Sequence, residues 1–267
     1  MTIRLLLSDV DGTLVTPQKE LAPRSVEAVH ELHEAGIHFA LTSGRPPRGM
    51  EMLVEPLALR APLVGFNGGL VVEPQMDVIE ERTLPPALVP RTIEILESAG
   101  LSVWLYRGAE WFVRDPDGPH VERETHTVQF VPTVVDTLDG IEDGVAKIVG
   151  VSDDYDAVAA AESAAHAELA EHVSASRSQP YYLDVTHPQA NKGAVVKFLA
   201  QRYSIPEEHI ATIGDMPNDV LMFARSGLSI AMGNAHREVQ RAARQVTTAN
   251  DDDGFANAVQ RFILGRS

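Results

Sequence analysis

The sequence predicts an α/β fold in which a parallel sheet is built from both ends of the chain. Short apolar runs typical of buried strands alternate with amphipathic helical patterns near the N-terminus, and again after residue 191. Between about residues 83 and 187 this alternation stops and the pattern changes. We therefore expect a core formed by residues 1–82 and 188–267, with residues 83–187 inserted as a separate unit.

The N-terminal part of the expected core contains three strands with a helix after each of the first two. The strands are expected at Ile3–Leu7, Ile37–Leu41 and Leu63–Phe66. The helices are expected at Pro23–Ala35 and Pro47–Glu55. Because a helix separates each strand from the next, the strands should run parallel.

The inserted unit is expected to contain two helices and five short strands. The helices are expected at Pro86–Ser98 and Tyr155–Ala170, and the strands at Leu101–Tyr106, Trp111–Val113, Lys147–Val151, His172–Ser176 and Tyr181–Val185. A loop rich in Asp, Gly and Pro precedes Lys147. After the insertion, helices at Ala194–Arg202, Val220–Ala224 and Asp251–Phe262 alternate with strands at Ile210–Ile213 and Leu228–Ala231.

Two carboxylates follow directly on the first predicted strand. Asp9 and Asp11 are separated by Val10, so along an extended chain both acidic side chains return to the same side. Residues just beyond the carboxyl end of a strand lie where ligands bind in open α/β sheets. Gly12 then allows the backbone to turn sharply. An isolated Asp-Gly pair would indicate only a turn, but this pair is not isolated.

A second acidic cluster, with Asp215 and Asp219, follows the predicted strand at Ile210–Ile213. If the two strands are neighbours in one parallel sheet, the carboxylates meet, and like charges at that distance require a cation or protons. Mg²⁺ is the expected cation, because it prefers oxygen ligands and shares its shell with substrate phosphate. His and Cys pairs with the spacing of zinc ligands are absent from the sequence, which disfavours a transition-metal site.

Four ordered motifs resemble those of the haloacid dehalogenase superfamily of phosphatases, and within it the Cof-type, sugar-phosphatase-like branch. They are Asp9-Val10-Asp11-Gly12-Thr13-Leu14, Leu41-Thr42-Ser43-Gly44-Arg45-Pro46, Lys192-Gly193 and Gly214-Asp215-Met216-Pro217-Asn218-Asp219. The resemblance spans the chain. It implies a doubly wound parallel-sheet (Rossmann-like) core, with residues 83–187 forming an inserted α+β cap of the C2B type. Such a cap would close over the phosphate, exclude water and select the leaving group.

The resemblance assigns catalytic roles to four residues. Asp9 would be the nucleophile that forms an aspartyl-phosphate. Asp11 would be the general acid and base, for which we expect acidic neighbours to raise its pKa. Ser43 would donate a hydrogen bond to the transferring phosphoryl group. Lys192 would pair with Asp9 and with phosphoryl oxygens, and this nearby anion would compensate for a cation placed at a helix N-terminus.

The resemblance also implies the ligands of Mg²⁺. They would be the Asp9 carboxylate, the backbone carbonyl of Asp11 and the Asp215 carboxylate. Asp219 would act either directly or through a water molecule. All four are expected from the motifs that end the two neighbouring strands.

Substrate contacts are expected from Gly44, Arg45, Asn67 and Asn218. Arg45 could instead be an ordinary ion-pair partner. Asn67-Gly68 is also a hairpin turn signal, and Asn218 could cap the helix that follows it. In the inserted unit, Trp104, Tyr106, Arg107, Trp111, Arg123, Arg177 and Tyr182 could select the leaving group, although most such aromatics fill a core. Arg123, Arg177 and His126 are the better candidates there, for sugar hydroxyls or a second phosphate.

Composition limits the classes of partner. The chain has 267 residues and a net charge of −16, which disfavours binding to nucleic acid or to an anionic membrane. The sequence has no stretch long and apolar enough to span a membrane, and no cysteine for disulfide or thiolate chemistry. We expect a cytoplasmic protein, with Asp9 too close to the N-terminus for a cleaved signal peptide. A monomer or small homo-oligomer is compatible with the sequence.

The resemblance therefore implies a Mg²⁺-dependent phosphomonoester hydrolase whose partner is a small phosphorylated metabolite, with sugar phosphates as the expected class and nucleotides or phosphorylated cofactors as the other candidates. A phosphosugar mutase would share the aspartyl-phosphate step but return the phosphoryl group to the substrate. A phosphate-binding protein without turnover is the alternative from another functional class.

Overall fold

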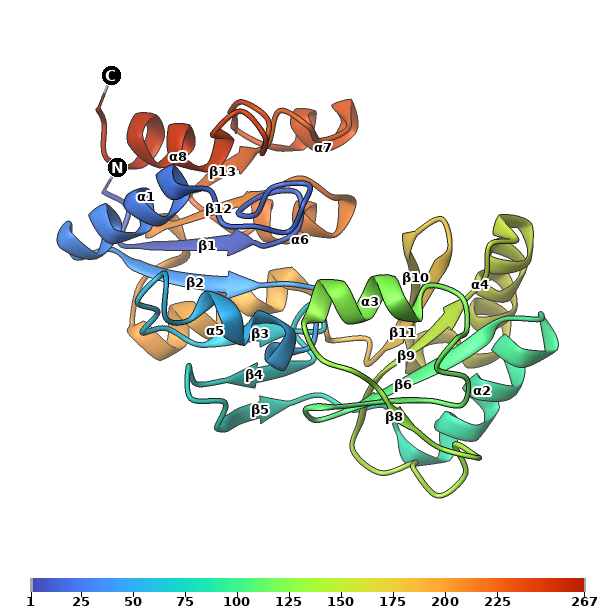
Figure 1. The fold of residues 1–267 in the computed structure, drawn as a ribbon. Helices are drawn as coiled ribbons and strands as arrows, with labels where there is room; N and C mark the ends of the chain where they lie inside the picture. Colours follow the sequence, from blue (N-terminus) through green and yellow to red (C-terminus); the bar gives the residue numbers. More distant parts are fainter. Residues whose placement is uncertain (1, 267) are drawn as a thin grey trace.

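The computed structural model describes residues 2–266, which form two β-sheets in separate parts of the molecule (Figure 1). The eight-stranded sheet has the order β14-β13-β12-β1-β2-β3-β4-β5, so it combines the first five strands of the chain with the last three. The six-stranded sheet has the order β10-β11-β9-β6-β7-β8 and contains the strands between them. In Figure 1 the blue and orange-to-red ends of the chain lie together, and the green-to-yellow middle forms the second lobe.

The predicted α/β fold is confirmed in the larger unit. Its strands are β1 (Leu5–Asp9), β2 (His38–Thr42), β3 (Leu63–Gly65), β4 (Leu70–Val72), β5 (Val78–Glu81), β12 (Ile210–Gly214), β13 (Leu228–Ala231) and β14 (Gln245–Val246). Its α-helices are α1 (Pro23–Glu34), α5 (Lys192–Tyr203), α6 (Val220–Phe223), α7 (Arg237–Ala242) and α8 (Gly254–Ala258). β1 pairs in parallel with both β2 and β12, whereas β4 and β5 add an antiparallel edge.

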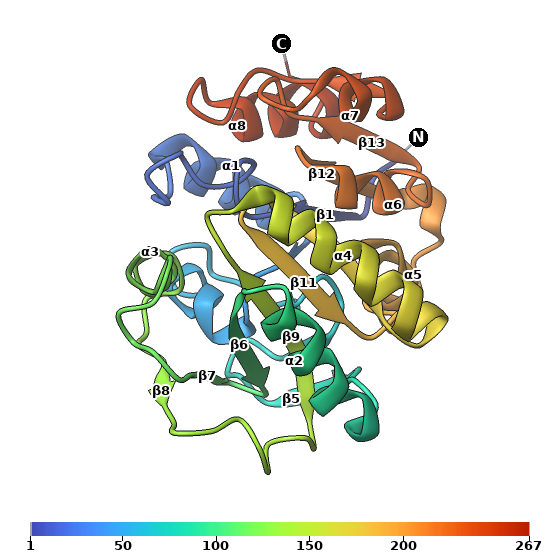
Figure 2. The same ribbon diagram turned by 90° about the vertical axis from the view of Figure 1, so that its right-hand side faces the viewer.

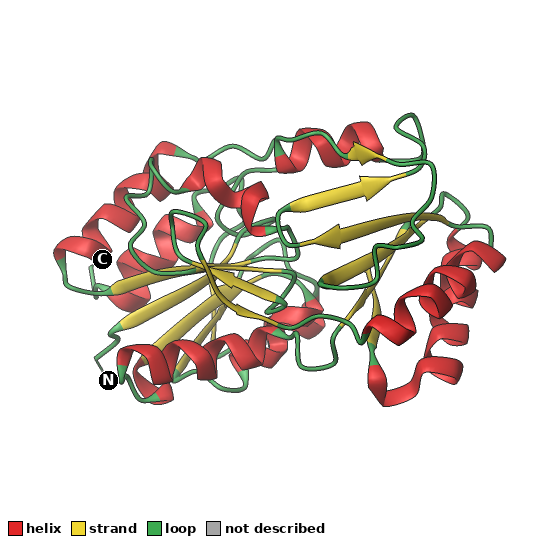
Figure 3. Cartoon of the chain, turned by 90° about the horizontal axis from the view of Figure 1, so that it is seen from below, coloured by secondary structure: helices red, strands yellow, loops and turns green. Residues whose placement is uncertain are grey.

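Helices cover both faces of this sheet (Figure 3). The central strand β1 is therefore buried on both faces, which explains its continuously apolar sequence. Leu6 of β1 packs in the cluster that contains Leu32 of α1. Leu5 and Leu7 point to the other face and pack in the cluster that contains Val196 of α5. A strand buried on both faces has no solvent side on which to place polar residues.

The six-stranded sheet lies within residues 102–186 and has helices on one face. Its strands are β6 (Ser102–Arg107), β7 (Glu110–Val113), β8 (Thr133–Val134), β9 (Val145–Val151), β10 (Ser174–Gln179) and β11 (Tyr182–Thr186). Helices α2 (Val89–Ser98) and α4 (Tyr155–Leu169) pack against each other on its outer face (Figure 2). The other face meets the larger unit, where the rings of Tyr106 and Phe66 have centroids 5.4 Å apart.

Helix α3 (Val121–Val128) lies in the stretch for which the sequence predicts a loop. Its buried residues are Val121 and Val128, two helical turns apart, so the apolar pattern that signals a helix is weak. The helix packs against the segment that begins at Pro47, where a Cβ on Gly49 would lie 3.0 Å from the Val128 side chain. Helix α3, which the sequence does not predict, lines the candidate active site.

Two other predicted helices differ in form. The segment expected as an α-helix at Pro47–Glu55 is a 3₁₀ helix at Pro47–Leu53, in which Gly49 disfavours α-helical winding. The last helix begins at Gly254 rather than Asp251, because Asp253 has a left-handed backbone with φ of 52°. It continues as a π-helical turn at Val259–Ile263.

Among the helices of residues 2–266, none combines the length and the apolar character that a bilayer crossing requires.

The packing of β1 makes a stability prediction. Leu7→Ala should lower the free energy of unfolding by about 2–5 kcal/mol, because the side chain is fully buried and its removal leaves a cavity. Leu221→Ala is the matched control, because Leu221 is 51% exposed and its truncation should change that free energy by no more than about 0.5 kcal/mol. Urea denaturation measures both. Equal losses for the two variants would contradict this account of the core.

Candidate active site

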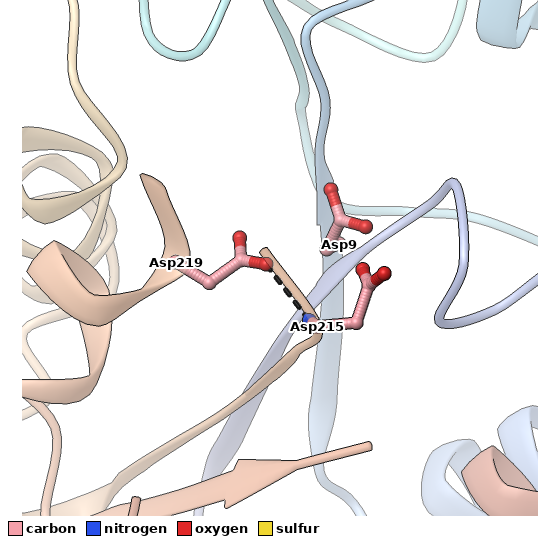
Figure 4. A group of neighbouring side chains, drawn as sticks. All are labelled: Asp9, Asp215 and Asp219. Atoms are coloured by element: carbon pink, nitrogen blue, oxygen red, sulfur yellow. Dashed lines mark hydrogen bonds between the residues drawn. The ribbon is translucent and has the colours of Figure 1, made fainter. Parts of the chain in front are cut away.

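The two acidic clusters meet at the carboxyl ends of adjacent parallel strands. β1 and β12 pair from Leu5 opposite Ile210 to Ser8 opposite Ile213, so Asp9 and Asp215 leave the sheet side by side. Asp9, Asp215 and Asp219 are buried, and each offers a carboxylate oxygen within 4.8 Å of the others. Figure 4 shows the side chains of Asp9 and Asp215 projecting from the two neighbouring segments into the same space.

Two glycines allow the carboxylates to approach the backbone. A Cβ on Gly12 would lie 2.3 Å from Oδ2 of Asp215, and the φ of Gly12 is +79°, which favours glycine. A Cβ on Gly214 would lie 2.4 Å from Cγ of Asp219. Gly12 and Gly214 therefore leave the space that the side chains of Asp215 and Asp219 occupy.

Lys192 is the cation of this cluster. It is the first residue of α5, whose N-terminus is capped by the Asn191 side chain accepting from the Ala194 N–H. The Lys192 Nζ donates to Oδ1 of Asp9 at 2.5 Å and to Oδ1 of Asp219 at 2.6 Å. Burial lowers the pKa of Lys192, but the two carboxylates outweigh burial and raise it. Anions therefore compensate for a cation at a helix N-terminus, as the sequence predicts.

One lysine does not neutralise the cluster. Burial, together with Asp219 and Asp215, raises the pKa of Asp9 well above its usual value against the opposing effect of Lys192. Burial and then Asp219 raise the pKa of Asp215 to about 6. Oδ2 of Asp9 is buried without a hydrogen-bond partner among residues 2–266. An unpartnered oxygen in an excess of negative charge fits a divalent cation that prefers oxygen ligands.

Asp219 uses both carboxylate oxygens within the protein. Oδ1 accepts from Lys192, and Oδ2 accepts from the backbone N–H groups of Asp215 and Met216, both at 2.9 Å. The first of these backbone bonds is the dashed line in Figure 4. Asp219 therefore holds the loop that carries Asp215 and fixes the position of Lys192.

Asp11 lies outside this group of carboxylates. Its Oδ2 accepts from Nε of Arg45 and its Oδ1 from Nη2 of Arg45, both at 2.7 Å, and Oδ1 also accepts from Nζ of Lys19 at 2.6 Å. Burial alone would raise the pKa of Asp11, but Arg45 and Lys19 outweigh burial and lower it to about 2. The expectation of a raised pKa is wrong, because the direct neighbours of this carboxylate are cations.

Arg45 is an ion-pair partner of Asp11, which is the alternative role predicted for it from the sequence. Its buried guanidinium also donates from Nη1 to the carbonyl oxygens of Gly49 at 3.1 Å and Thr127 at 2.8 Å. Thr127 belongs to α3, so Arg45 connects the second motif to both Asp11 and the inserted unit. Lys19 was missed from sequence, because a single lysine in a turn carries no local signal of its distant partner.

A cavity of about 170 Å³ opens beside these residues. Its wall contains all the residues of the larger unit expected to act in catalysis or substrate binding, which are Asp9, Asp11, Ser43, Gly44, Arg45, Asn67, Lys192 and Asn218. Asp215 and Asp219 are not part of this wall. The four motifs, which are far apart in sequence, are therefore brought to one cavity.

Asn67 and Asn218 contact each other across the cavity rim. Nδ2 of Asn218 donates to Oδ1 of Asn67 at 3.1 Å. Asn67 lies in the turn between β3 and β4 with φ of 57°, so its turn interpretation is correct and compatible with its place in the cavity wall. The side chain of Asn218 reaches Asn67 and does not cap α6.

The inserted unit supplies the opposite wall, mainly through polar and tyrosine residues. Those from α3 are Arg123, Glu124 and Thr127, and those from β9 and the β10–β11 hairpin include Lys147, Tyr181, Tyr182 and Asp184. Of the sequence candidates, Arg123 and Tyr182 line the cavity, whereas His126 and Arg177 do not. Arg177 instead pairs with Glu162 at 2.8 Å. Trp104, Tyr106 and Trp111 are buried, as expected of most of these aromatics.

Lys147 and Asp184 were missed from sequence. Each is a charged residue inside an otherwise apolar strand, and that local anomaly is the signal that could have identified them. Glu124 was missed together with its helix.

Comparison with known proteins identifies relatives along nearly the whole chain. The model of a family described as haloacid dehalogenase-like hydrolase matches residues 6–259. A protein named putative phosphatase from Haemophilus influenzae is 29% identical over 96% of this chain and 97% of its own length. Pyridoxal phosphate phosphatase from Escherichia coli is 26% identical over 99% of this chain and 100% of its own.

A solved structure shows the same architecture. The crystal structure of a haloacid dehalogenase-like hydrolase from Bacteroides thetaiotaomicron superposes with a TM-score of 0.88 at 30% identity. The match covers 97% of this chain and 99% of that one.

The close approach of Gly12 to Asp215 makes a second stability prediction. Gly12→Ala and Gly36→Ala both place a side chain at positive φ, at +79° and +72°, and each should lose about 1–3 kcal/mol of unfolding free energy from backbone strain. Gly12→Ala should lose more, since its methyl group meets Asp215, whereas Gly36 has open space around it. Chemical denaturation of both variants measures the difference, and equal losses would exclude an effect of the Asp215 contact.

Proposed function

Since this chain belongs to the haloacid dehalogenase-like hydrolase family and is a phosphatase, we propose that it is a Mg²⁺-dependent phosphomonoester hydrolase that acts on small phosphorylated metabolites, with sugar phosphates as the expected class. The observation that carries this proposal is Asp9, a buried carboxylate in the cavity wall with one oxygen held by Lys192 and the other unpartnered. The cavity of about 170 Å³ is smaller than a typical drug-binding pocket, which favours a compact substrate.

In the proposed reaction Asp9 is the nucleophile. A carboxylate oxygen of Asp9 forms a bond to phosphorus while the bond from phosphorus to the leaving oxygen breaks, giving an aspartyl-phosphate. Water then attacks the same phosphorus, which releases inorganic phosphate and restores Asp9. Lys192 favours the ionised form of Asp9 and offsets negative charge on the phosphoryl oxygens. Ser43, in the same wall, donates a hydrogen bond to that group.

Asp11 is the proposed general acid and base. In the conformation described above it is ionised, but its low pKa makes it a weak base, so looser contacts with Arg45 and Lys19 would favour its taking a proton from the attacking water. Protonating the leaving oxygen in the first step requires looser contacts with Arg45 and Lys19. An incoming phosphoryl dianion competes with Asp11 for these cations, which supplies a physical cause for that change.

The proposed Mg²⁺ ligands are the carboxylates of Asp9 and Asp215 and the backbone carbonyl of Asp11. We assign Asp219 a contact through water, because both of its oxygens are already used by the protein. Mg²⁺, when bound, neutralises charge on the cluster and on the phosphoryl group. Asp219 contributes by orienting Lys192 and the Asp215 loop.

Residues 83–187 are the proposed cap, inserted into a core of residues 1–82 and 188–267. Two contacts support this role, since Lys147 Nζ donates to the Gly44 carbonyl at 3.3 Å and Arg45 donates to the Thr127 carbonyl at 2.8 Å. Both reach the loop that carries Ser43, so cap position and the catalytic loop are linked. A cytoplasmic location and a monomer or small homo-oligomer stay predictions.

The first test is release of inorganic phosphate from sugar phosphates, nucleotides and phosphorylated cofactors. The wild-type protein should release phosphate with Mg²⁺ and lose this activity in EDTA. Asp9→Asn should abolish turnover without unfolding the protein, because the amide is nearly isosteric but is not a nucleophile. If the Asp9→Asn variant kept wild-type activity, Asp9 would be excluded as the nucleophile. Conversion of a sugar phosphate to its isomer without phosphate release would favour a mutase.

A second test separates the two steps at Asp11. Asp11→Asn should lower the rate by roughly two to four orders of magnitude, the usual scale for a lost general acid and base. Where the leaving group needs no proton, as with acetyl phosphate, the first step should survive and phosphoenzyme should accumulate. Quenched-flow measurement of acid-stable protein-bound phosphate detects it. An unchanged hydrolysis rate would refute the assignment.

A further inference from the structure

The wall of the cavity formed by the six-stranded sheet contains a polar group that the proposed catalytic steps do not use. Tyr182 and Asp184 lie two residues apart on β11, so their side chains share one face of the sheet. Lys147 on the adjacent strand β9 lies opposite Thr186, which places it on the same face. All three residues line the cavity that contains Asp9 and Lys192.

Asp184 and Lys147 form a buried ion pair with an unused oxygen. Lys147 Nζ donates to Oδ2 of Asp184 at 3.1 Å, and the two residues are 8% and 4% exposed, respectively. Oδ1 of Asp184 has no hydrogen-bond partner among residues 2–266. Buried carboxylates are normally hydrogen-bonded at both oxygens, so this arrangement is incomplete without a donor from elsewhere.

Tyr182 repeats this pattern beside Asp184. Its hydroxyl is buried and unpartnered within the described part of the chain, although its ring packs against Trp104 and Tyr181. Burial raises the pKa of Tyr182, so the hydroxyl stays protonated and can both donate and accept. Two neighbouring side chains on one wall of the cavity thus each have an unused hydrogen-bonding capacity.

The missing partner can be described by its chemistry. Oδ1 of Asp184 requires a proton donor, which a second phosphate dianion does not provide. Lys147 has three N–H donors, of which two are directed to Asp184 and to the Gly44 carbonyl, so one remains for an oxygen acceptor. A hydroxyl group donates and accepts at once, and adjacent hydroxyls would satisfy Asp184, Tyr182 and Lys147 together.

We propose that Asp184, Tyr182 and Lys147 form a subsite that binds hydroxyl groups of the leaving group, so that the protein selects phosphate monoesters of polyhydroxylated compounds. This inference rests on the proposed phosphatase function and adds its specificity-determining residues. It also replaces the sequence-based candidates His126 and Arg177, which do not line the cavity.

The experiment compares two substrates of equal carbon number, ribitol 5-phosphate and pentyl phosphate, which differ in the hydroxyls of the leaving group. The wild-type protein should show a kcat/KM at least about tenfold higher for ribitol 5-phosphate, since at least one hydrogen bond to a charged group is made only with that substrate. A ratio near one would overturn the proposal. Acetyl phosphate is the common reference, and its failure to be hydrolysed would overturn the proposed function itself.

Tyr182→Phe tests the subsite without breaking an internal contact, because the hydroxyl that it removes has no hydrogen-bond partner among residues 2–266. We expect kcat/KM for ribitol 5-phosphate to fall by about two- to tenfold, the effect of one neutral hydrogen bond, with pentyl phosphate unchanged. The unfolding temperature should not fall. Tyr155→Phe, which removes an exposed hydroxyl on α4, is the matched control and should change neither substrate.

Asp184→Asn should reduce kcat/KM for ribitol 5-phosphate by about ten- to a hundredfold and spare pentyl phosphate, because the charged acceptor is lost. Asp139→Asn is its control on an exposed loop. Equal losses on both substrates in the Asp184 variant would indicate that the ion pair only supports the cap, and would overturn the subsite. If that variant fails to fold, the Tyr182→Phe substrate ratio still decides between the two outcomes.

Discussion

The ammonium group of Lys192, held between Asp9 and Asp219, is the interaction on which the site depends. Lys192 is 183 positions from Asp9 and 27 positions from Asp219 in the chain. The interaction therefore forms only when β1, β12 and α5 are assembled. Burying three carboxylates in one place is unfavourable unless cations compensate. Lys192 provides part of that compensation, and the unpartnered oxygen of Asp9 shows where more positive charge is required.

The loop Ser43-Gly44-Arg45 is the second point at which distant parts of the molecule meet. Its Gly44 carbonyl accepts from Lys147, and Arg45 reaches both Asp11 and the Thr127 carbonyl. A movement of the six-stranded unit would therefore change contacts on the same loop that lines the cavity. This gives the proposed cap a direct physical route to Asp11, and it accounts for the burial of Arg45.

The fold was largely predictable because its signals are local. Apolar runs flanked by helical patterns located β1, β2, β12 and β13 to within about two residues. The helix α3 was missed because its apolar pattern is sparse, and the lowered pKa of Asp11 was missed for a different reason. Arg45 and Lys19 reach Asp11 only in the folded chain, whereas the acidic residues of the motifs suggested the opposite shift.

The sequence by itself determined the α/β class, the order of the motifs and the residues that gather at the carboxyl ends of β1 and β12, because strand periodicity and motif spacing are properties of short segments. Tertiary structure decided the charge state and partners of each group. Asp11 pairs with cations, both carboxylate oxygens of Asp219 accept hydrogen bonds from the protein, and one oxygen of Asp184 has no partner among the described residues. Such outcomes depend on distances between residues far apart in the chain, and no local pattern encodes those distances.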